Sequence, residues 1–254
     1  MRKLYVIGIG AGNPDYVTMQ AVKALNKVDV FFFLDKGEAK DDLVRLRKEI
    51  CERYIEGHSY RIVEAVDPVR DPAIEDYKLR VEGWHEQRVL LYEGMLRQEL
   101  GEDECGAFLV WGDPSLYDST LRIVDQITAR KNISLLYEVI PGITSVQALA
   151  AGHRIPLHGI GESIHITTGR ALEEGLPPGA ENVLIMLDGK LSFRGLAEED
   201  LYIYWGAYLG MESEVLVSGT LKDVTAWIEG IRAEARQSKG WIMDTYLLRR
   251  QAPS

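Results

Sequence analysis

The sequence predicts an α/β protein of two domains, the first with a mainly parallel sheet and the second with a more mixed sheet. In residues 3–141, apolar segments typical of strands alternate with segments typical of helices. This alternation favours a parallel sheet with helices on both faces. In residues 163–250, five strand-like segments follow with fewer helices between them. Glycines and Pro156 in "AAGHRIPLHGIGES" mark the connection, so we expect domains over 1–152 and 160–254 and a linker over 153–159.

Each element has its own sequence signal. Thr18 precedes the helix-like "MQAVKAL" and is a favourable N-cap residue. Asp71 and Pro72 precede a long amphipathic segment and predict the start of a helix that continues to Leu100. The predicted strands cover 3–9, 29–34, 60–66, 106–112, 135–141, 163–168, 182–188, 201–209, 213–221 and 240–250, and the other main helices cover 41–50, 117–130 and 222–236.

The composition is that of a globular protein with an acidic charge balance. Hydrophobic residues make up 46% of the 254 residues, and 29 Lys and Arg stand against 39 Asp and Glu. The formal net charge of −10 argues against nucleic acid or an anionic membrane as a partner, but not against an anionic small molecule. The N-terminus has no signal-peptide pattern, and "VDVFFFL" is too short to span a membrane. We therefore expect a cytoplasmic protein.

Two cysteines, Cys51 and Cys105, form no C-x-x-C pair and have no histidine at metal-ligand spacing. We expect no metal site. Two reduced thiols are favoured, although a disulfide between them stays open at this point.

Three glycine-containing loops follow predicted strands of the first domain. They read "GIGAGNP", "WGDPSLYDS" and "PGITS". Open α/β sheets bind ligands at the carboxyl ends of their strands. Gly112 permits close backbone approach, Asp113 supplies a carboxylate acceptor, and Thr144 or Ser145 is placed to cap a helix. One such loop is weak evidence for a site, but three on successive strands are much more specific.

The first loop invites a dinucleotide-binding interpretation, with Asp29 or Asp35 as the ribose ligand. That interpretation is disfavoured, because Asn13 stands where the third glycine belongs and Pro14 follows it. The next helix begins only near Thr18, so no helix N-terminus lies close to the glycines.

Together these motifs resemble the tetrapyrrole (corrin and porphyrin) methylases over nearly the whole chain. The matching segments are "VIGIGAGNPDYVT", "GDPSLY", "VIPGITSVQALAA", "NVLIMLD" and "VLVSGTLKDV". The resemblance implies two α/β/α domains with the active site in the cleft between them, S-adenosylmethionine as cofactor and a small-molecule tetrapyrrole as substrate. One departure is Ala11, where many members of the family have proline.

Within the family, "FFFLDKGEAKDDLVRLRKEICERY" and "AVDPVRDP" resemble the branch that methylates C-1 of precorrin-5 and releases acetic acid. Methyl transfer needs positioning more than acid–base groups, whereas acetyl release needs a water and calls for a general base. The candidates for a catalytic role are Asp113, Tyr117 and His158.

The resemblance also implies cofactor contacts, although a methionine on an apolar strand is more often a core residue. The cofactor-binding candidates are Gly112, Asp113, Tyr117, Thr144, Ser145, Met186, Ala207, Tyr208 and Thr220. For the substrate we expect a trough floor and a basic rim facing its carboxylates. The substrate-binding candidates are Gly10 and Gly12 for the floor and Arg154, Arg170 and Arg194 for the rim.

Four alternatives stay open on the sequence. They are a corrin methylase acting at C-11, C-17 or C-20, a diphthine-synthase-like methylase, an NAD-dependent oxidoreductase, and a tetrapyrrole-binding protein without activity. The family resemblance and the apolar content also lead us to expect a homodimer.

Overall fold

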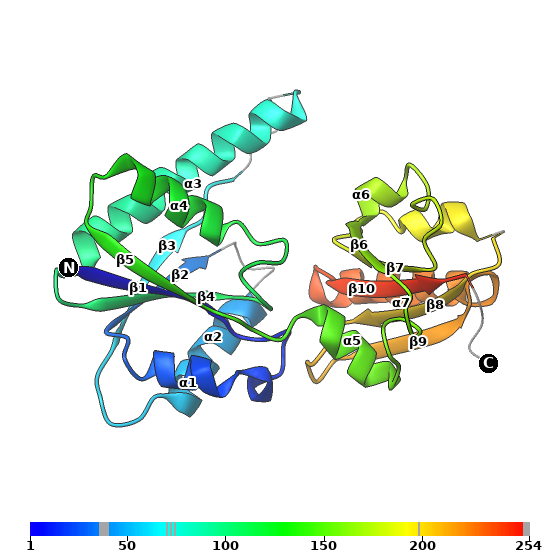
Figure 1. The fold of residues 1–254 in the computed structure, drawn as a ribbon, viewed down its shortest axis with the longest axis horizontal. Helices are drawn as coiled ribbons and strands as arrows, with labels where there is room; N and C mark the ends of the chain where they lie inside the picture. Colours follow the sequence, from blue (N-terminus) through cyan, green and yellow to red (C-terminus); the bar gives the residue numbers. More distant parts are fainter. Residues whose placement is uncertain (36–40, 70, 72, 74, 198, 251–254) are drawn as a thin grey trace. The chain divides into compact units, whose positions relative to one another are not determined.

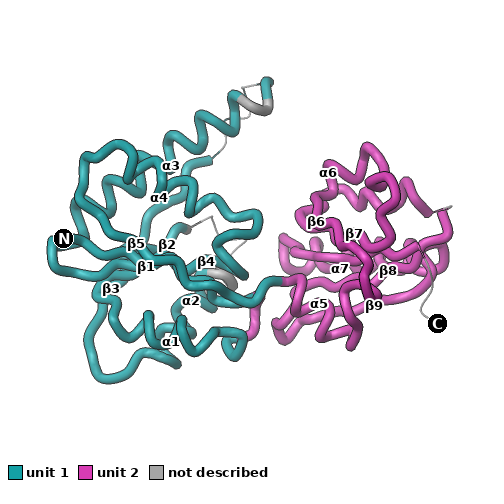
Figure 2. The backbone as a smooth tube through the Cα atoms, viewed as in Figure 1, with its two compact units in different colours: residues 1–10, 14–144 teal, residues 11–13, 145–254 magenta. Residues whose placement is uncertain are grey.

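The computed structural model describes residues 1–35, 41–69, 71, 73, 75–197 and 199–250 (Figure 1). The chain divides into two compact units, coloured separately in Figure 2. Unit 1 contains residues 1–10 and 14–144, and unit 2 contains residues 11–13 and 145–254. The division after Thr144 falls before the linker expected at 153–159, because the helix that starts at Ser145 packs on the second sheet.

The sheet of unit 1 is entirely parallel. Its strand order is β3-β2-β4-β1-β5. The register pairs Gly8 with Val110 and Ile7 with Ile140, so β4, β1 and β5 end at the same edge of the sheet. The strands are β1 (Arg2–Gly8), β2 (Val30–Asp35), β3 (Arg61–Val66), β4 (Cys105–Val110) and β5 (Leu135–Ile140).

Helices cover both faces of this sheet. On β2, Val30 and Phe32 belong to one buried cluster and Phe31 and Phe33 to another, as the two-residue period of a strand requires. The first cluster lies under α3 (Tyr77–Glu99) and α4 (Thr120–Arg130), and the second under α1 (Met19–Leu25) and α2 (Asp41–Tyr54). A short 3₁₀ helix, η1 (Pro14–Tyr16), comes before α1.

The structure confirms one predicted helix start and corrects another. Thr18 caps α1, since its hydroxyl accepts a hydrogen bond from Ala21 N at 3.1 Å. The start predicted at Asp71 and Pro72 is wrong: α3 begins at Tyr77, and Pro72 lies outside the described residues. Asp76 is the cap there, because its carboxylate accepts from Leu79 N at 3.1 Å.

Unit 2 contains a mixed sheet, as predicted, and all five expected strands form. The order is β6-β7-β10-β8-β9, in which β6 and β7 are parallel and the other neighbours antiparallel. Helix α5 (Ser145–His153) contacts β8, β9 and β10, while α7 (Leu221–Lys239) packs on a separate cluster that includes Trp205 and Tyr246. The remaining elements are β6 (Ile164–Thr168), α6 (Gly169–Leu172), β7 (Asn182–Met186), η3 (Ser192–Leu196), β8 (Tyr202–Ala207), β9 (Val215–Thr220) and β10 (Asp244–Arg249).

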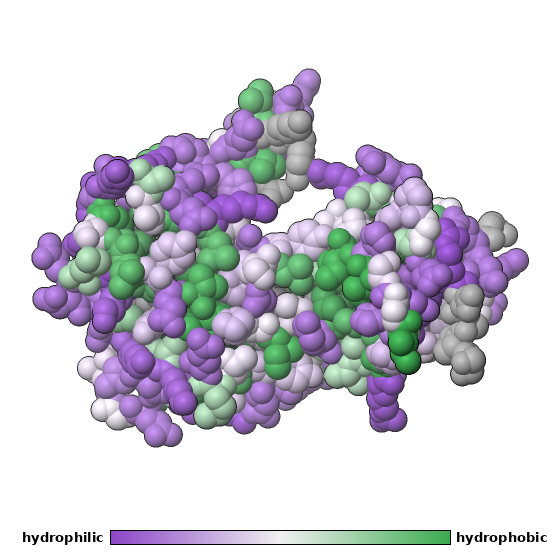
Figure 3. Space-filling view, in the orientation of Figure 1, coloured by the Kyte–Doolittle hydropathy of each residue, from purple (hydrophilic) through white to green (hydrophobic). Residues whose placement is uncertain are grey.

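Both cysteines are free and buried in unit 1, which confirms the expectation of two thiols. Burial raises the pKa of Cys51 to about 12 and that of Cys105 to about 11. Across the described part of the chain, none of the helices has the length and apolar character needed to cross a membrane. Hydrophilic side chains are interspersed with smaller apolar areas on the face drawn in Figure 3.

Candidate functional site

The three glycine-containing loops of unit 1 meet at the carboxyl ends of β1, β4 and β5. A Cβ atom added to Gly142 would lie 2.1 Å from Gly112 O, and one added to Gly8 would lie 2.6 Å from Gly142 N. Gly10 and Gly112 form an isolated bridge, in which Gly112 N donates to Gly10 O at 2.8 Å. The loops are therefore held in direct backbone contact, which only glycine permits at these positions.

Asp113 links two of these loops through its carboxylate. Oδ2 accepts from Gly142 N at 2.8 Å, and Oδ1 accepts from Ser115 N at 2.8 Å and from the Ser115 hydroxyl. Partial burial disfavours the charged form, but the hydrogen bonds from Ser115 and Gly142 outweigh it and hold the pKa of Asp113 below its ordinary value. A carboxylate bonded in this way is a weak base, so the geometry gives Asp113 a task in joining the loops.

Tyr117 is held in a strained conformation at the tip of the same loop. Its φ of 52° lies in the left-handed region, and its side chain is 44% exposed. Partial burial raises the pKa of its phenol, which therefore keeps its proton at neutral pH. Strain of this kind persists where the surroundings enforce it, and it is common at ligand sites.

The far end of this loop is tied to a buried ion pair. Arg88 donates to the Ser119 hydroxyl, and its Nε lies 2.8 Å from Asp67 Oδ1. Arg88 also donates to the Tyr92 hydroxyl at 2.8 Å. Arg88 and Asp67 are both almost completely buried. The loop from Asp113 to Ser119 is thus anchored at both ends, which leaves Tyr117 exposed between two fixed points.

In unit 2, several candidates lie at one edge of the sheet. Met186 pairs with Thr245, and Thr245 pairs with Gly206, so these three residues face the same side. Thr245 lies 2.9 Å from Ser145, hydroxyl to hydroxyl, at the start of α5. Leu187, directly after Met186, has a φ of 55° and a side chain that is 61% exposed. The sequence did not single out Leu187, since a leucine after an apolar strand is typical of the core.

Ala207 is the last residue of β8 and Tyr208 follows it, but the side chains of both lie in the cluster under α7. Ala207 is fully buried. The Tyr208 hydroxyl donates to Trp241 O at 2.5 Å, and its ring packs edge-on against Trp241. The side chains of Ala207 and Tyr208 therefore lie on the opposite face of the sheet from that of Met186, so at these two positions the backbone is what the Met186 side can offer a ligand.

Three candidates from the sequence lie elsewhere in unit 2. Thr220 pairs with Tyr202, at the opposite end of the sheet from Ala207. His158 is exposed, and its Nδ1 lies 2.8 Å from Gly159 O. Arg154 is also exposed and follows α5, which starts at Ser145 beside Thr245. Thr220, the one cofactor candidate among them, therefore lies away from Met186 within unit 2.

The structure places the remaining substrate candidates as follows. Gly10 and Gly12 are buried, with φ of 86° and 134°, and a Cβ on Gly12 would lie 2.6 Å from Leu209 O. Both act as close-packed backbone. Arg170 is exposed beside the end of β6, and Arg194 forms an ion pair with Glu229. The described residues hold no group of three or more His, Cys, Asp or Glu that could bind a metal ion.

The dinucleotide interpretation finds no support in this geometry. Gly12 is followed by η1, and α1 begins only at Met19. The first α-helix after these glycines therefore starts seven residues beyond Gly12, which is not the dinucleotide-binding arrangement. The side chain of Asp35 lies outside the described residues.

Known proteins share the sequence and the fold of this chain. Residues 3–225 match the family of Tetrapyrrole (Corrin/Porphyrin) Methylases. A precorrin-6A synthase (deacetylating) from Sinorhizobium sp is 49% identical over 252 residues, which cover 99% of this chain and 97% of the relative. A crystal structure of a cobalamin synthesis related protein (CobF) from Corynebacterium diphtheriae matches with a TM-score of 0.84 and 40% identity, over 99% of this chain and 100% of that one.

A uroporphyrin-III C-methyltransferase from Thermus thermophilus, solved in complex with S-adenosylhomocysteine, has the same fold. Its TM-score is 0.56 at 18% identity, over 97% of this chain and 92% of that one. This match supports the fold alone.

Substituting Gly142 by alanine tests the contact between the loops. The new Cβ would lie 2.1 Å from a backbone oxygen, so we expect the free energy of unfolding to fall by at least about 3 kcal/mol in urea denaturation. Gly83→Ala, in α3 with open space around its Cβ, is the matched control and should raise stability by about 0.5–1 kcal/mol. Equal effects of the two substitutions would contradict the proposed contact.

Substituting Asp113 by asparagine tests the carboxylate link through its pH dependence. The folded-state pKa of Asp113 is depressed, so its stabilisation is complete above the unfolded value of about 3.9 and is lost as the pH falls through the folded value. We expect D113N to be less stable than the wild type at pH 7, and the difference to shrink below pH 4. Asp103→Asn, with a fully exposed carboxylate, is the control and should leave stability unchanged at both pH values.

Proposed function

Because this chain belongs to the tetrapyrrole (corrin/porphyrin) methylases, we propose that it is a precorrin-6A synthase of the deacetylating kind. The enzyme transfers a methyl group from S-adenosylmethionine to C-1 of precorrin-5 in cobalamin biosynthesis, and acetic acid leaves as precorrin-6A forms. The observation that carries the proposal is 49% identity over 99% of the chain to a relative of that name. A match of 40% identity and TM-score 0.84 to a cobalamin synthesis related protein supports it.

The residues of each unit suit S-adenosylmethionine, which supplies a methyl group on a positively charged sulfur. In unit 1, Gly112 adopts a φ of 68° next to Thr144. Because Gly112 has no side chain, the amino-acid end of the cofactor can approach the backbone of this loop closely. In unit 2, the exposed Leu187 and the partly buried Met186 offer an apolar surface for adenine. We assign the main cofactor contacts to these residues together with Tyr117 and Ser145.

Positioning is the main contribution that the chain makes to methyl transfer. A bound donor and acceptor held in attack geometry react as one molecule, which removes much of the entropic barrier. The glycine contacts and the Asp113 bonds make the unit 1 loops rigid enough for this task. For acetyl release, the exposed Tyr117 keeps its phenol proton and can donate a hydrogen bond to the acetyl carbonyl that water attacks.

An assay of the purified protein with precorrin-5 and labelled S-adenosylmethionine tests the reaction. We expect one acetic acid released for each methyl group transferred. Methyl transfer without acetic acid would instead indicate a corrin methylase acting at C-11, C-17 or C-20. NAD binding, or substrate binding without methyl transfer, would overturn the proposal.

Substituting Tyr117 by glycine tests separately how its backbone strain affects stability and how its side chain affects kcat. Glycine adopts a φ near 52° without strain, so we expect stability to stay unchanged or to rise by up to about 1 kcal/mol while kcat falls. Lys131→Gly is the matched control, because Lys131 has a φ of 56° at the end of α4. That variant should gain similar stability and keep full activity. A Y117G enzyme as active as K131G would exclude a role for Tyr117.

The proposal includes two further expectations from the sequence, a cytoplasmic location and a homodimer. Light scattering on the purified protein checks the second, since a homodimer has twice the 28.6 kDa mass of the chain.

A further inference from the structure

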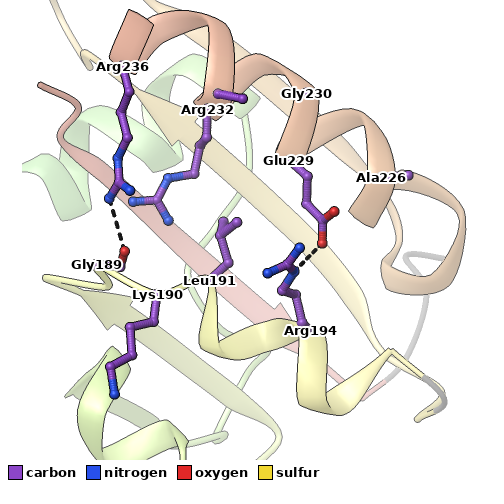
Figure 4. Close-up of a pocket in the computed structure, with 10 residues that line it drawn as sticks. Gly189, Lys190, Leu191, Arg194, Ala226, Glu229, Gly230, Arg232 and Arg236 are labelled. Atoms are coloured by element: carbon purple, nitrogen blue, oxygen red, sulfur yellow. Dashed lines mark hydrogen bonds and ion pairs between the residues drawn. The ribbon is translucent and has the colours of Figure 1, made fainter. Parts of the chain in front are cut away.

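Unit 2 contains a basic pocket that lies outside the residues to which we assign the cofactor. The pocket has a volume of about 660 Å³ and lies between α7 and the loop that follows β7 (Figure 4). We call it the α7 pocket. Its lining includes one acidic side chain, Glu229, and four basic ones: Lys190, Arg194, Arg232 and Arg236.

The α7 pocket is separate from Met186, the cofactor candidate on β7. Val183 and Ile185 on β7 belong to the buried cluster under α7. Successive side chains of a strand point to opposite faces, so Met186 faces the other side of the sheet. A ligand in the α7 pocket would therefore lie on the opposite face from the Met186 side chain.

Arg232 is the most unusual residue of the α7 pocket, because it is charged and only 3% exposed. Its Nη2 donates to Asp188 O at 2.9 Å, and its Nε lies 3.5 Å from Asp244 Oδ2. Its Nη1 is buried and has no hydrogen-bond partner among the described residues. An unpaired buried N–H of a charged group is costly, so Arg232 Nη1 is a donor that a bound acceptor would satisfy.

Arg236 brings a second guanidinium to the same place. It follows Arg232 by one helical turn and donates to Gly189 O at 2.9 Å. The two arginines thus bind successive carbonyls of one loop, and Figure 4 shows their guanidinium groups next to one another. Burial raises the pKa of Asp244, although Arg232 and a hydrogen bond from Trp205 oppose that shift.

The other charged side chains of the α7 pocket already have partners. Arg194 is paired with Glu229. Lys190 lies 2.9 Å from Glu173, and Figure 4 shows its side chain directed away from Arg232 and Arg236. A ligand would therefore meet the charge of Arg236, whose hydrogen bond goes to a carbonyl, and that of Arg232, which Asp244 partly balances.

We propose that the α7 pocket binds the oxyanion group of a small molecule, a phosphate or a carboxylate, through Arg232 Nη1 and the guanidinium of Arg236. The planar arginine fork matches both groups, because each presents two oxygens in one plane. Leu191 and Ala233 supply apolar lining for the rest of the ligand. The volume falls within the range of roughly 300–1,000 Å³ that is typical of small-molecule sites.

Calorimetric titration of the full-length protein in a low-chloride buffer tests this proposal, with inorganic phosphate in one arm and succinate in the other. We expect saturable binding at one site per chain in at least one arm, and the arm that binds more tightly identifies the oxyanion. Arg236→Gln and Arg232→Lys should each weaken that binding at least about tenfold. Arg250→Gln, an exposed arginine of unit 2 paired with Glu199, is the matched control and should bind as the wild type does.

Circular dichroism will show whether each variant folds. Arg236 is exposed, so R236Q should fold and test the proposal even if R232K, at a buried position, does not. Saturable binding lost in R236Q and kept in R250Q supports the α7 pocket. Absence of binding in both arms, or equal binding by R236Q and the wild type, overturns the proposal.

Discussion

The close approach of three backbone segments, at Gly8, Gly112 and Gly142, is the constraint on which the candidate site of unit 1 depends. A side chain at Gly8 or Gly142 would overlap backbone atoms of the neighbouring loops. Parallel strands end at a common edge, so the loops after β4, β1 and β5 must share one small space there. Because glycine has no side chain, the backbones of the three loops can touch there, and together they form one continuous surface.

The carboxylate of Asp113 strengthens this contact between the loops. The carboxylate of Asp113 spans from its own loop to Gly142 N, and the bonds from Ser115 complete its shell. Because its carboxylate oxygens already accept these hydrogen bonds, Asp113 stabilises the contact between the loops and is a poor general base. Tyr117 differs, because it is strained, exposed and fixed between two anchors, of which the second is the buried Arg88. The same loop thus contains a carboxylate with a structural role, Asp113, and an exposed side chain that a ligand can reach, Tyr117.

In unit 2, strand register decides which side chains lie on the same face of the sheet. Met186, Thr245 and Gly206 pair across three strands and face one side, whereas Ala207, one residue further, faces the core under α7. Thr220 lies at the other end of the sheet because β9 runs antiparallel to β8. Opposite faces of one sheet can therefore carry separate sites, with Met186 on one face and the basic α7 pocket on the other.

Hydrophobic periodicity and turn residues in the sequence determined the α/β class, the ten strands and the change from a parallel to a mixed sheet, because these depend on local patterns. The motifs likewise located the three loops and Asp113. Only the tertiary structure decided that Ala207 and Tyr208 are buried, that Leu187 is exposed and that α3 starts at Tyr77. It also brought Arg232 and Arg236 to the loop after β7. These outcomes depend on strand order, register and face, which are set by contacts between residues far apart in the chain.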